Sequence, residues 1–337
     1  MPPKETPQTL WLRKLVEKYP STSQRGIARI AYAEKPEWFA DYEACRGRVR
    51  RICGSYGKRH RLDTIDKSQF RAPQSDPLED FIPPPLSEDL ETWAVQKLPR
   101  KQKWLVLADV HVPFHDRQAL NAAIDKGKDE GCTSVLLLGD FMDFYSCSRF
   151  DKTPNLVTLR EERDMTISVL AGLRDHFPDA ENMVWLLGNH EERWEAFLIR
   201  KAEELFDLPD FELAEVCRAS ALGITVIGKK QPLTVGKLHI IHGHEFAGSW
   251  YNPVNPARGL FLRAKVTAVG AHNHQTSEHS ESALDGVNIT CWSVGCLCGL
   301  HPRYMPINKW NHGFAVIDDT DKTWTLDNYR IHDGEVR

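Results

Sequence analysis

Residues 103–111 read Lys-Trp-Leu-Val-Leu-Ala-Asp-Val-His, an apolar run that ends in an acid and a histidine. Two further runs have the same form: residues 134–138 lead into Gly-Asp-Phe-Met-Asp, and residues 182–187 lead into Gly-Asn-His-Glu. Uninterrupted apolar runs of this length are typical of strands buried on both faces. The intervening residues 116–130 and 157–177 have helical spacing. This β-α-β-α-β order predicts an α/β domain.

Two later apolar runs, residues 237–241 and 265–269, end in His-Gly-His and Gly-Ala-His-Asn-His. Ligands bind at the carboxyl ends of strands in open α/β sheets. The side chains at these strand ends are therefore our candidate metal ligands: Asp109, His111, Asp140, Asn189, His242, His272 and His274. Seven oxygen and imidazole donors suit two divalent ions, for which we favour Mn, with Fe, Zn and Ni as alternatives. A shared carboxylate would hold the two ions about 3.5 to 4 Å apart.

Taken in order, Asp-x-His, Gly-Asp-x-x-Asp, Gly-Asn-His-Glu, His-Gly and Gly-x-His-x-His resemble the motifs of the calcineurin-like metallophosphoesterases, over about residues 102–330. The resemblance implies a sandwich of two mixed β-sheets flanked by helices. It implies that one metal is bound by Asp109, His111, Asp140 and His274. It implies that the second is bound by Asp140, Asn189, His242 and His272. A hydroxide bridging the two ions would then attack the phosphorus of a phosphate ester.

The same resemblance makes His190 a catalytic residue rather than a ligand. It would protonate the leaving oxygen or stabilise the transition state, with Asp143 orienting its ring. Glu191, the next residue, is interpreted as an acid at a helix start and is left out of the site.

Two further positions near the motifs leave alternatives open. His244 competes with His242, because both follow the same strand; we favour His242, which directly precedes the glycine of the family motif. Arg149 is a candidate for binding a phosphate oxygen, and the alternative is a loop arginine in solvent or in a salt bridge.

The basic residues are concentrated at the amino-terminal end. Residues 1–62 hold 14 Lys and Arg against 6 Asp and Glu, so the remaining 275 residues are acidic overall. We expect three short helices here: one begins at Thr6-Pro7, one is capped within residues 21–23, and one begins after Pro36 and closes at Gly54. A helix-turn-helix bound to phosphates is the functional interpretation, and a basic face that packs on protein is the alternative. The candidate nucleic-acid-binding residues are Arg46, Arg48, Arg50, Arg51, Lys58 and Arg59.

A proline-rich, polar stretch separates this segment from the motifs. We therefore predict a basic helical module at residues 1–62, an extended linker at 63–101 and a metallophosphoesterase domain at 102–337. Short motifs in the first segment also resemble the segment that precedes such domains in phage and prophage proteins. That resemblance implies a phage or bacterial setting.

Composition excludes several classes of protein. With 41% hydrophobic and 27% charged residues, the chain is globular rather than disordered or fibrous. Its longest apolar runs fall far short of the ~18 residues of a membrane span. The first residues lack the pattern of a secretory signal, so we expect a cytoplasmic protein. Its 8 cysteines never form Cys-x-x-Cys, and we expect reduced thiols, with Cys296 and Cys298 packing rather than binding metal.

The motifs predict the reaction class, not the substrate. The basic module favours a phosphodiesterase or nuclease that acts on nucleic acid. The alternative is a phosphomonoesterase for a nucleotide, small metabolite or phosphoprotein, whose module docks a protein. A non-catalytic binding protein is the third hypothesis, and the complete ligand set argues against it.

Overall fold

The computed structural model describes residues 6–20, 22–53, 94–154, 156–228, 230–246 and 254–337. The chain divides into two compact units, Met1–Glu91 and Thr92–Arg337. Most of the predicted linker lies outside the described residues. The last residues of the predicted linker are described. Gln96–Lys97 form a short strand, β1, so the sheet structure begins before the boundary predicted at residue 102.

The described residues of the first unit form three α-helices: Pro7–Lys18 (α1), Gln24–Glu34 (α2) and Tyr42–Ile52 (α3). The side chains of Thr6 and Ser23 cap α1 and α2, as the sequence predicts. The predicted start of the third helix is wrong. Pro36–Trp38 form only a 3-10 turn, and α3 begins six residues after Pro36 because the Asp41 carboxylate accepts a hydrogen bond from the Ala44 N–H. Gly54, its predicted end, lies outside the described residues.

These helices share a core formed by one face of each. Leu12, Ala28 and Val49 are fully buried and belong to the same hydrophobic cluster. Helices of 11 and 12 residues are marginal alone, so this packing supplies most of their stability. The all-helical module is thus present.

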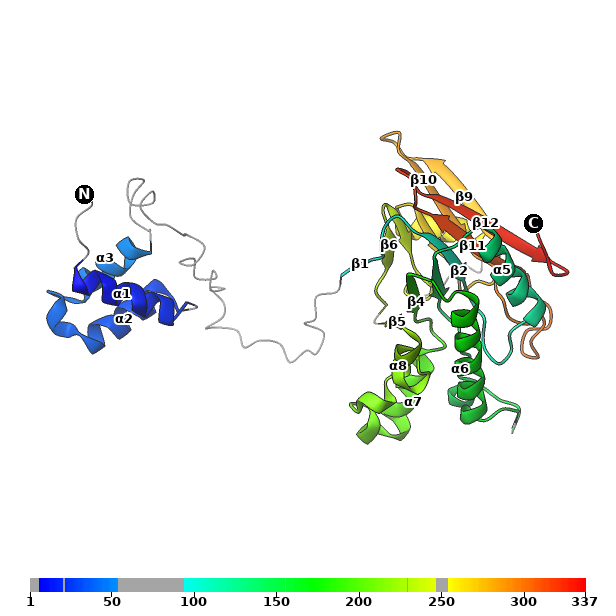
Figure 1. Cartoon of the computed structure of the whole chain (residues 1–337), viewed down its shortest axis with the longest axis horizontal. Helices are drawn as coiled ribbons and strands as arrows, with labels where there is room; N and C mark the ends of the chain where they lie inside the picture. Colours follow the sequence, from blue (N-terminus) through cyan, green and yellow to red (C-terminus); the bar gives the residue numbers. More distant parts are fainter. Residues whose placement is uncertain (1–5, 21, 54–93, 155, 229, 247–253) are drawn as a thin grey trace. The chain divides into compact units, whose positions relative to one another are not determined.

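Two mixed sheets form the second unit (Figure 1). The seven-stranded sheet has the order β13-β12-β11-β2-β3-β4-β5. Its strands are Glu335–Val336 (β13), Thr325–His332 (β12), His312–Asp318 (β11), Lys103–Leu107 (β2), Ser134–Leu138 (β3), Asn182–Leu186 (β4) and Ile224–Ile227 (β5). Strands β2 to β5 are parallel to one another, and β11 to β13 are antiparallel to their neighbours.

The six-stranded sheet has the order β1-β6-β7-β8-β10-β9. Its remaining strands are Leu233–Val235 (β6), Leu238–Ile240 (β7), Ala268–Gly270 (β8), Asn288–Ser293 (β10) and Ser277–Ser282 (β9). β7, β8 and β10 are parallel, whereas β6 and β9 pair antiparallel to β7 and β10.

Alternating side chains of β2 belong to two different cores. Leu105 and Leu107 pack with the helices, whereas Trp104 and Val106 pack with residues of the six-stranded sheet. Because side chains alternate along a strand, this sheet is buried on both faces and the two sheets form a sandwich. The predicted fold class is confirmed.

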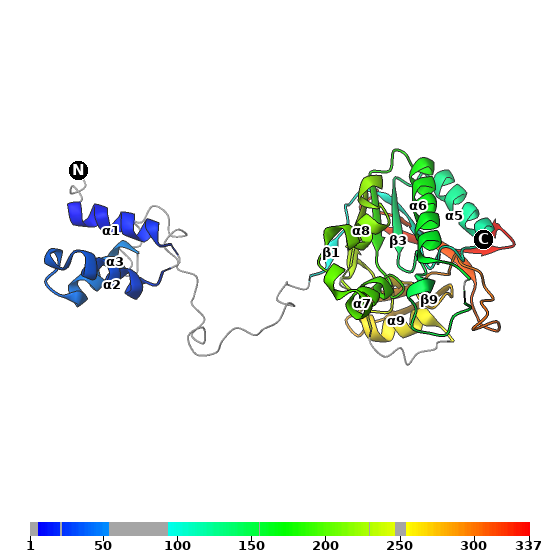
Figure 2. The ribbon, with the colours of Figure 1, turned by 90° about the horizontal axis from the view of Figure 1, so that it is seen from below.

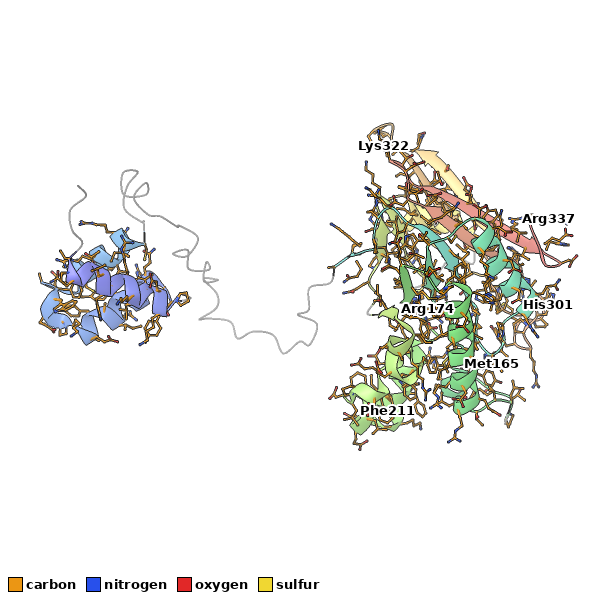
Figure 3. All side chains as sticks on the ribbon, viewed as in Figure 1. Met165, Arg174, Phe211, His301, Lys322 and Arg337 are labelled. Carbon is orange, nitrogen blue, oxygen red and sulfur yellow. The ribbon has the colours of Figure 1, made fainter. Side chains whose placement is uncertain are left out.

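Helices cover the outer faces of the sandwich (Figure 2). Arg117–Asp129 (α5) and Leu159–His176 (α6) contribute to the core of the seven-stranded sheet, and Pro256–Ala264 (α9) packs on β8 and β10. Glu192–Lys201 (α7) and Leu213–Val216 (α8) complete the unit. Arg174, labelled in Figure 3, ties α6 to the turn before β5. Its guanidinium donates to the carbonyls of Leu222 and Gly223. No helix among the described residues is long and apolar enough to cross a membrane.

Candidate metal centre

The predicted site residues of the seven-stranded sheet follow three adjacent parallel strands. Asp109 and His111 come after β2, Asp140 after β3, and Asn189 after β4. Leu107 is in register with Leu137, and Leu138 with Leu186, so these strands end at one edge. Parallel pairing therefore brings residues about 80 positions apart in the chain to a single place.

The histidines of the six-stranded sheet approach from the other layer. His242 follows β7, and His272 and His274 follow the neighbouring parallel strand β8. The Ala271 N–H donates to the His242 carbonyl, and the His272 N–H donates to the Asp109 carboxylate at 3.0 Å. The two sheets thus meet at this edge through the candidate ligands themselves.

The backbone here is unusual, because five of the seven candidate ligands have positive φ angles. They are Asp109 (49°), His111 (51°), Asp140 (48°), His272 (67°) and His274 (56°). A non-glycine residue in this conformation costs on the order of 1 kcal/mol or more, and such residues cluster at functional sites. The surrounding hydrogen bonds, such as the one from the His111 N–H to the Asp140 carbonyl, hold the strained turns in place.

The side chains form two clusters that share Asp140. Asp109, His111 and Asp140 form one, with His274 Nε2 lying 3.3 Å from Asp109 Oδ1 and 3.2 Å from His111 Nε2. Asp140, His242 and His272 form the other, in which His242 Nε2 lies 3.3 Å from Asp140 Oδ2. The geometry therefore places the aspartate expected to bridge two ions between two groups of donors.

Several buried donor atoms at this place have no hydrogen-bond partner. They are Asp109 Oδ1, Asn189 Oδ1, His242 Nε2 and His272 Nδ1. The 3.3 Å contacts of Asp109 Oδ1 with His274 and of His242 Nε2 with Asp140 are ion-pair contacts and not hydrogen bonds. A buried polar atom without a partner costs about 1 to 3 kcal/mol, and four at one place require a compensating interaction. Divalent ions would supply it, since every one of these atoms is a suitable ligand for Mn, Fe or Zn. The residues present fit a dimetal centre.

The electrostatics favour the ionisation states that ligands need at Asp140 and His272. At His242 they favour the protonated ring, because the Asp140 carboxylate outweighs burial and raises the pKa of His242 to about 10. Burial opposes ionisation of Asp140, but His190 and His242 outweigh it and hold the pKa of Asp140 well below its usual range. Burial and the charge of His242 lower the pKa of His272 to about 4. A charged carboxylate and a neutral imidazole are the forms that bind metal ions.

Asp143 is bonded to two histidines rather than one. Its Oδ2 lies 3.1 Å from His111 Nδ1 and 3.2 Å from His190 Nδ1. A carboxylate on one ring nitrogen fixes the orientation of the ring and leaves the other nitrogen to face the site. Asp143 therefore orients a candidate ligand, His111, as well as His190.

His190 borders the shared carboxylate. Its Nε2 lies 3.8 Å from Asp140 Oδ2, and its backbone N–H donates to Asp140 Oδ1 at 2.8 Å. Burial lowers the pKa of His190, but the charges of Asp140 and Asp143 outweigh it and raise that pKa.

A family model described as calcineurin-like phosphoesterase matches residues 103–290 of this sequence. The chain belongs to the calcineurin-like phosphoesterase family. This calcineurin-like phosphoesterase is accordingly a metal-dependent hydrolase of phosphate esters. No curated protein matches the chain significantly in sequence.

Solved structures with a similar arrangement have low identity to this calcineurin-like phosphoesterase. A mutant of Vps29 from Entamoeba histolytica is 15% identical, with a TM-score of 0.37, and the match covers 70% of this chain and 96% of that one. The phosphoesterase YfcE from E. coli is 13% identical, with a TM-score of 0.33 and coverages of 64% and 88%. A dimetal phosphatase from Danio rerio is 12% identical, with a TM-score of 0.33 and coverages of 69% and 96%.

The two histidines after β7 have different surroundings in this phosphoesterase. His242 is fully buried, and its Nδ1 lies 2.8 Å from the Leu138 carbonyl, which directs Nε2 into the site. His244 Nε2 instead lies 2.9 Å from a Glu192 carboxylate oxygen. The glycine of Gly-Asp is needed here, because a Cβ at Gly139 would overlap the His242 ring.

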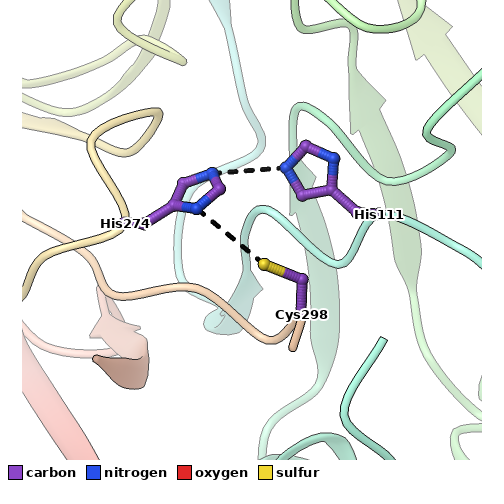
Figure 4. A group of neighbouring side chains, drawn as sticks. All are labelled: His111, His274 and Cys298. Carbon is purple, nitrogen blue, oxygen red and sulfur yellow. Dashed lines mark hydrogen bonds between the residues drawn. The ribbon is translucent and has the colours of Figure 1, made fainter. Parts of the chain in front are cut away.

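The structure also locates Arg149 and the cysteines, whose positions the sequence left open. Arg149 is exposed, and its guanidinium lies over the Phe150 ring. The 8 cysteines form no disulfide. Cys298 is buried with its sulfur 3.8 Å from His274 Nδ1, on the opposite side of the ring from the contact between His274 Nε2 and His111 (Figure 4). With His111 and His274 this thiol forms a group whose ligand atoms lie close enough together to hold a metal ion, so packing rather than metal binding stays a prediction for Cys298.

Sequence reasoning missed the role of Glu191. Its carboxylate is buried and accepts four backbone hydrogen bonds, from the N–H groups of Asp140, Phe141, Met142 and Gly188. It thereby joins the loop after β3 to the loop after β4. The only signal in the sequence is an acid directly after a cluster of strand-end polar residues, and that signal is shared by ordinary helix starts.

Replacing Glu191 by Gln is expected to destabilise the protein by about 2 to 5 kcal/mol, because the amide NH₂ would face two backbone donors and leave them unpaired. The free energy of unfolding in denaturant measures this. The adjacent Glu192→Gln is the matched control: Glu192 is half-exposed and bonds a side chain, so we expect a change below about 1 kcal/mol. Equal stability of the two variants would contradict the role of Glu191.

Proposed function

We propose that this calcineurin-like phosphoesterase is a dimetal phosphodiesterase that cleaves nucleic acid. The observation that carries the reaction type is the pair of donor clusters sharing Asp140, with four buried donor atoms that have no partner. The proposed specificity for nucleic acid rests on the basic residues 1–62.

The ligands divide into two sets in this proposal. One ion is held by Asp109, His111, Asp140 and His274, and the other by Asp140, Asn189, His242 and His272. Oxygen and imidazole donors without thiolates favour Mn over softer ions. Bound there, the ions would lower the pKa of water and neutralise charge on the phosphoryl oxygens.

His190 and Asp143 provide the proton chemistry in this proposal. Asp143 holds His190 Nδ1, so Nε2 is directed toward the region next to the shared carboxylate. A proton on Nε2 would pass to the leaving oxygen of the ester, which departs as an alcohol. Burial lowers the pKa of His190, but the charges of Asp140 and Asp143 outweigh it and raise that pKa, which supports a role as a proton donor.

The candidate nucleic-acid-binding residues have different surroundings. Arg51 is exposed in the last turn of α3. Arg46 is paired with Glu43 at 2.8 Å, and Arg48 donates to Gln8 and lies over the Phe39 ring. Lys58 and Arg59 lie outside the described residues.

The two paired arginines favour a second candidate function. A guanidinium that already bonds Glu43 or Gln8 has fewer free donors for a phosphate backbone. The runner-up is therefore a phosphomonoesterase, for a nucleotide, small metabolite or phosphoprotein, whose helical unit docks a protein.

A substrate panel separates the two candidates. The Mn-loaded chain would be given a bis-aryl phosphodiester, an aryl phosphomonoester, cyclic nucleotides, and labelled single- and double-stranded DNA and RNA. We expect preference for the diester and cleavage of at least one polymer. Preference for the monoester with all polymers intact would establish the runner-up instead.

Deleting residues 1–62 is expected to leave hydrolysis of the bis-aryl diester unchanged and to weaken binding of the cleaved polymer. The loss should be larger at 50 mM than at 200 mM salt, because phosphate contacts release counterions. The small diester is the internal control for folding of the remaining unit. Equal polymer affinity with and without residues 1–62 would contradict the role of the basic unit.

A further inference from the structure

One arginine lies inside the site and has no role in the assignments above. Arg193 is in the first turn of α7, three residues after His190. Its Nη1 donates to the Asp143 carbonyl at 2.9 Å and to Asp143 Oδ1 at 3.2 Å. Its Nη2 lies 2.8 Å from His190 Nε2. The guanidinium thus lies beside both residues of the proposed proton chemistry.

The position of this guanidinium borders the place where a phosphate would bind. His190 Nε2 contacts Arg193 on one side and lies 3.8 Å from the shared Asp140 carboxylate on the other. About a fifth of the Arg193 side chain is exposed, so it is partly open to solvent. By contrast, Arg149 is exposed and packs on Phe150.

The two ends of the guanidinium have unequal partners. Nη1 bonds Asp143 twice, and this ion pair fixes the position of the group. Nη2 faces a ring nitrogen, which is a weaker partner for a guanidinium than an anionic oxygen. We therefore expect Nη2 to donate to a phosphate oxygen in place of the His190 ring nitrogen.

We propose that Arg193 binds a non-bridging phosphate oxygen of the substrate through Nη2, while Nη1 remains bonded to Asp143. This inference rests on the proposed function and extends it to substrate binding. When Nη2 leaves His190 Nε2 for the phosphate oxygen, Nε2 is free to face the leaving oxygen of the ester. Arg193 serves any phosphate ester, whether a monoester or a diester.

The affinity of the Mn-loaded full chain for inorganic phosphate tests the proposal, measured by calorimetry. We expect Arg193→Ala to raise the dissociation constant about 10- to 100-fold, because a charge-assisted hydrogen bond is lost. Arg193→Lys should retain part of the affinity, since it keeps the charge but not the fork. Arg200→Ala, two turns later on the same helix and exposed, is the control and should bind phosphate like the wild type.

A purely structural role predicts a different pattern. If Arg193 only positions Asp143 and His190, then kcat of Arg193→Ala falls while KM and the phosphate affinity stay at wild-type values, and the proposal is overturned. Manganese content and thermal unfolding are measured for each variant, and if Arg193→Ala does not fold, Arg193→Lys carries the test. Failure of the proposed function is distinguishable: the wild type would then leave every polymer intact, while the phosphate affinity of Arg193→Ala would still be lower than that of the wild type.

Discussion

Replacing Asp140 by Ala is expected to abolish metal binding and hydrolysis together. Asp140 is the member common to both donor clusters, and its Oδ2 lies 3.3 Å from His242 Nε2 and 3.9 Å from His111 Nε2. Its loss removes one ligand from each of two proposed ions. We expect metal content to fall from two ions to fewer than one, and turnover to fall by about 10³-fold or more, because the nucleophile is no longer generated near neutral pH.

Elemental analysis after desalting and hydrolysis of the small diester measure the two effects. Asp140 Oδ1 also accepts the His190 N–H, so Asp140→Asn is a second variant that keeps an acceptor at this position. Asp151→Ala removes an exposed acid 11 residues later and should retain both ions and full activity. Two tightly bound ions in Asp140→Ala would show that this carboxylate is not the bridge.

Replacing His190 by Ala is expected to leave both ions bound and to slow turnover by about 10²- to 10⁴-fold. The reason is that His190 is held by Asp143 beside the shared carboxylate and is outside the proposed ligand set. Metal content at the wild-type level together with a fall in kcat is the expected combination.

The leaving group gives this prediction a second readout. An aryl diester with a highly acidic phenol needs no proton on its leaving oxygen, so the variant should lose less activity on it than on a diester with an alkyl leaving group. His332→Ala removes a largely exposed histidine and serves as the control. Full activity of His190→Ala on both esters would refute the assigned role.

Local sequence patterns predicted the regular elements well where burial was strong. β2, β3 and β4 have apolar runs whose residues are almost all buried, and such runs have few alternatives to a central strand. The prediction of element boundaries failed where a single side chain or a distant strand decided the outcome. The start of α3 depends on one bond from Ala44 to Asp41, and β1 depends on pairing with a strand more than 130 residues away.

The site residues also divide into those that local sequence predicted and those that depend on contacts with distant residues. Candidate ligands were recognisable because polar residues after buried strands must lie at one edge of a sheet. Glu191 and Arg193 were not, because an acid and a basic residue in the first turn of a helix are common on any surface. Their partners, the backbone of residues 140–142 and the Asp143 carboxylate, lie about 50 residues earlier in the chain.

The sequence by itself determined the α/β class, the order of the strands that carry the motifs, and the chemical type of the metal ligands. Each follows from local periodicity or from the residue type at a strand end. The folded structure was needed to show which donor atoms face one another and that Arg193 rather than Arg149 lies beside His190. The physical reason is that hydrogen bonds and metal sites depend on distances of a few ångströms between distant parts of the chain, and packing two sheets against each other sets those distances.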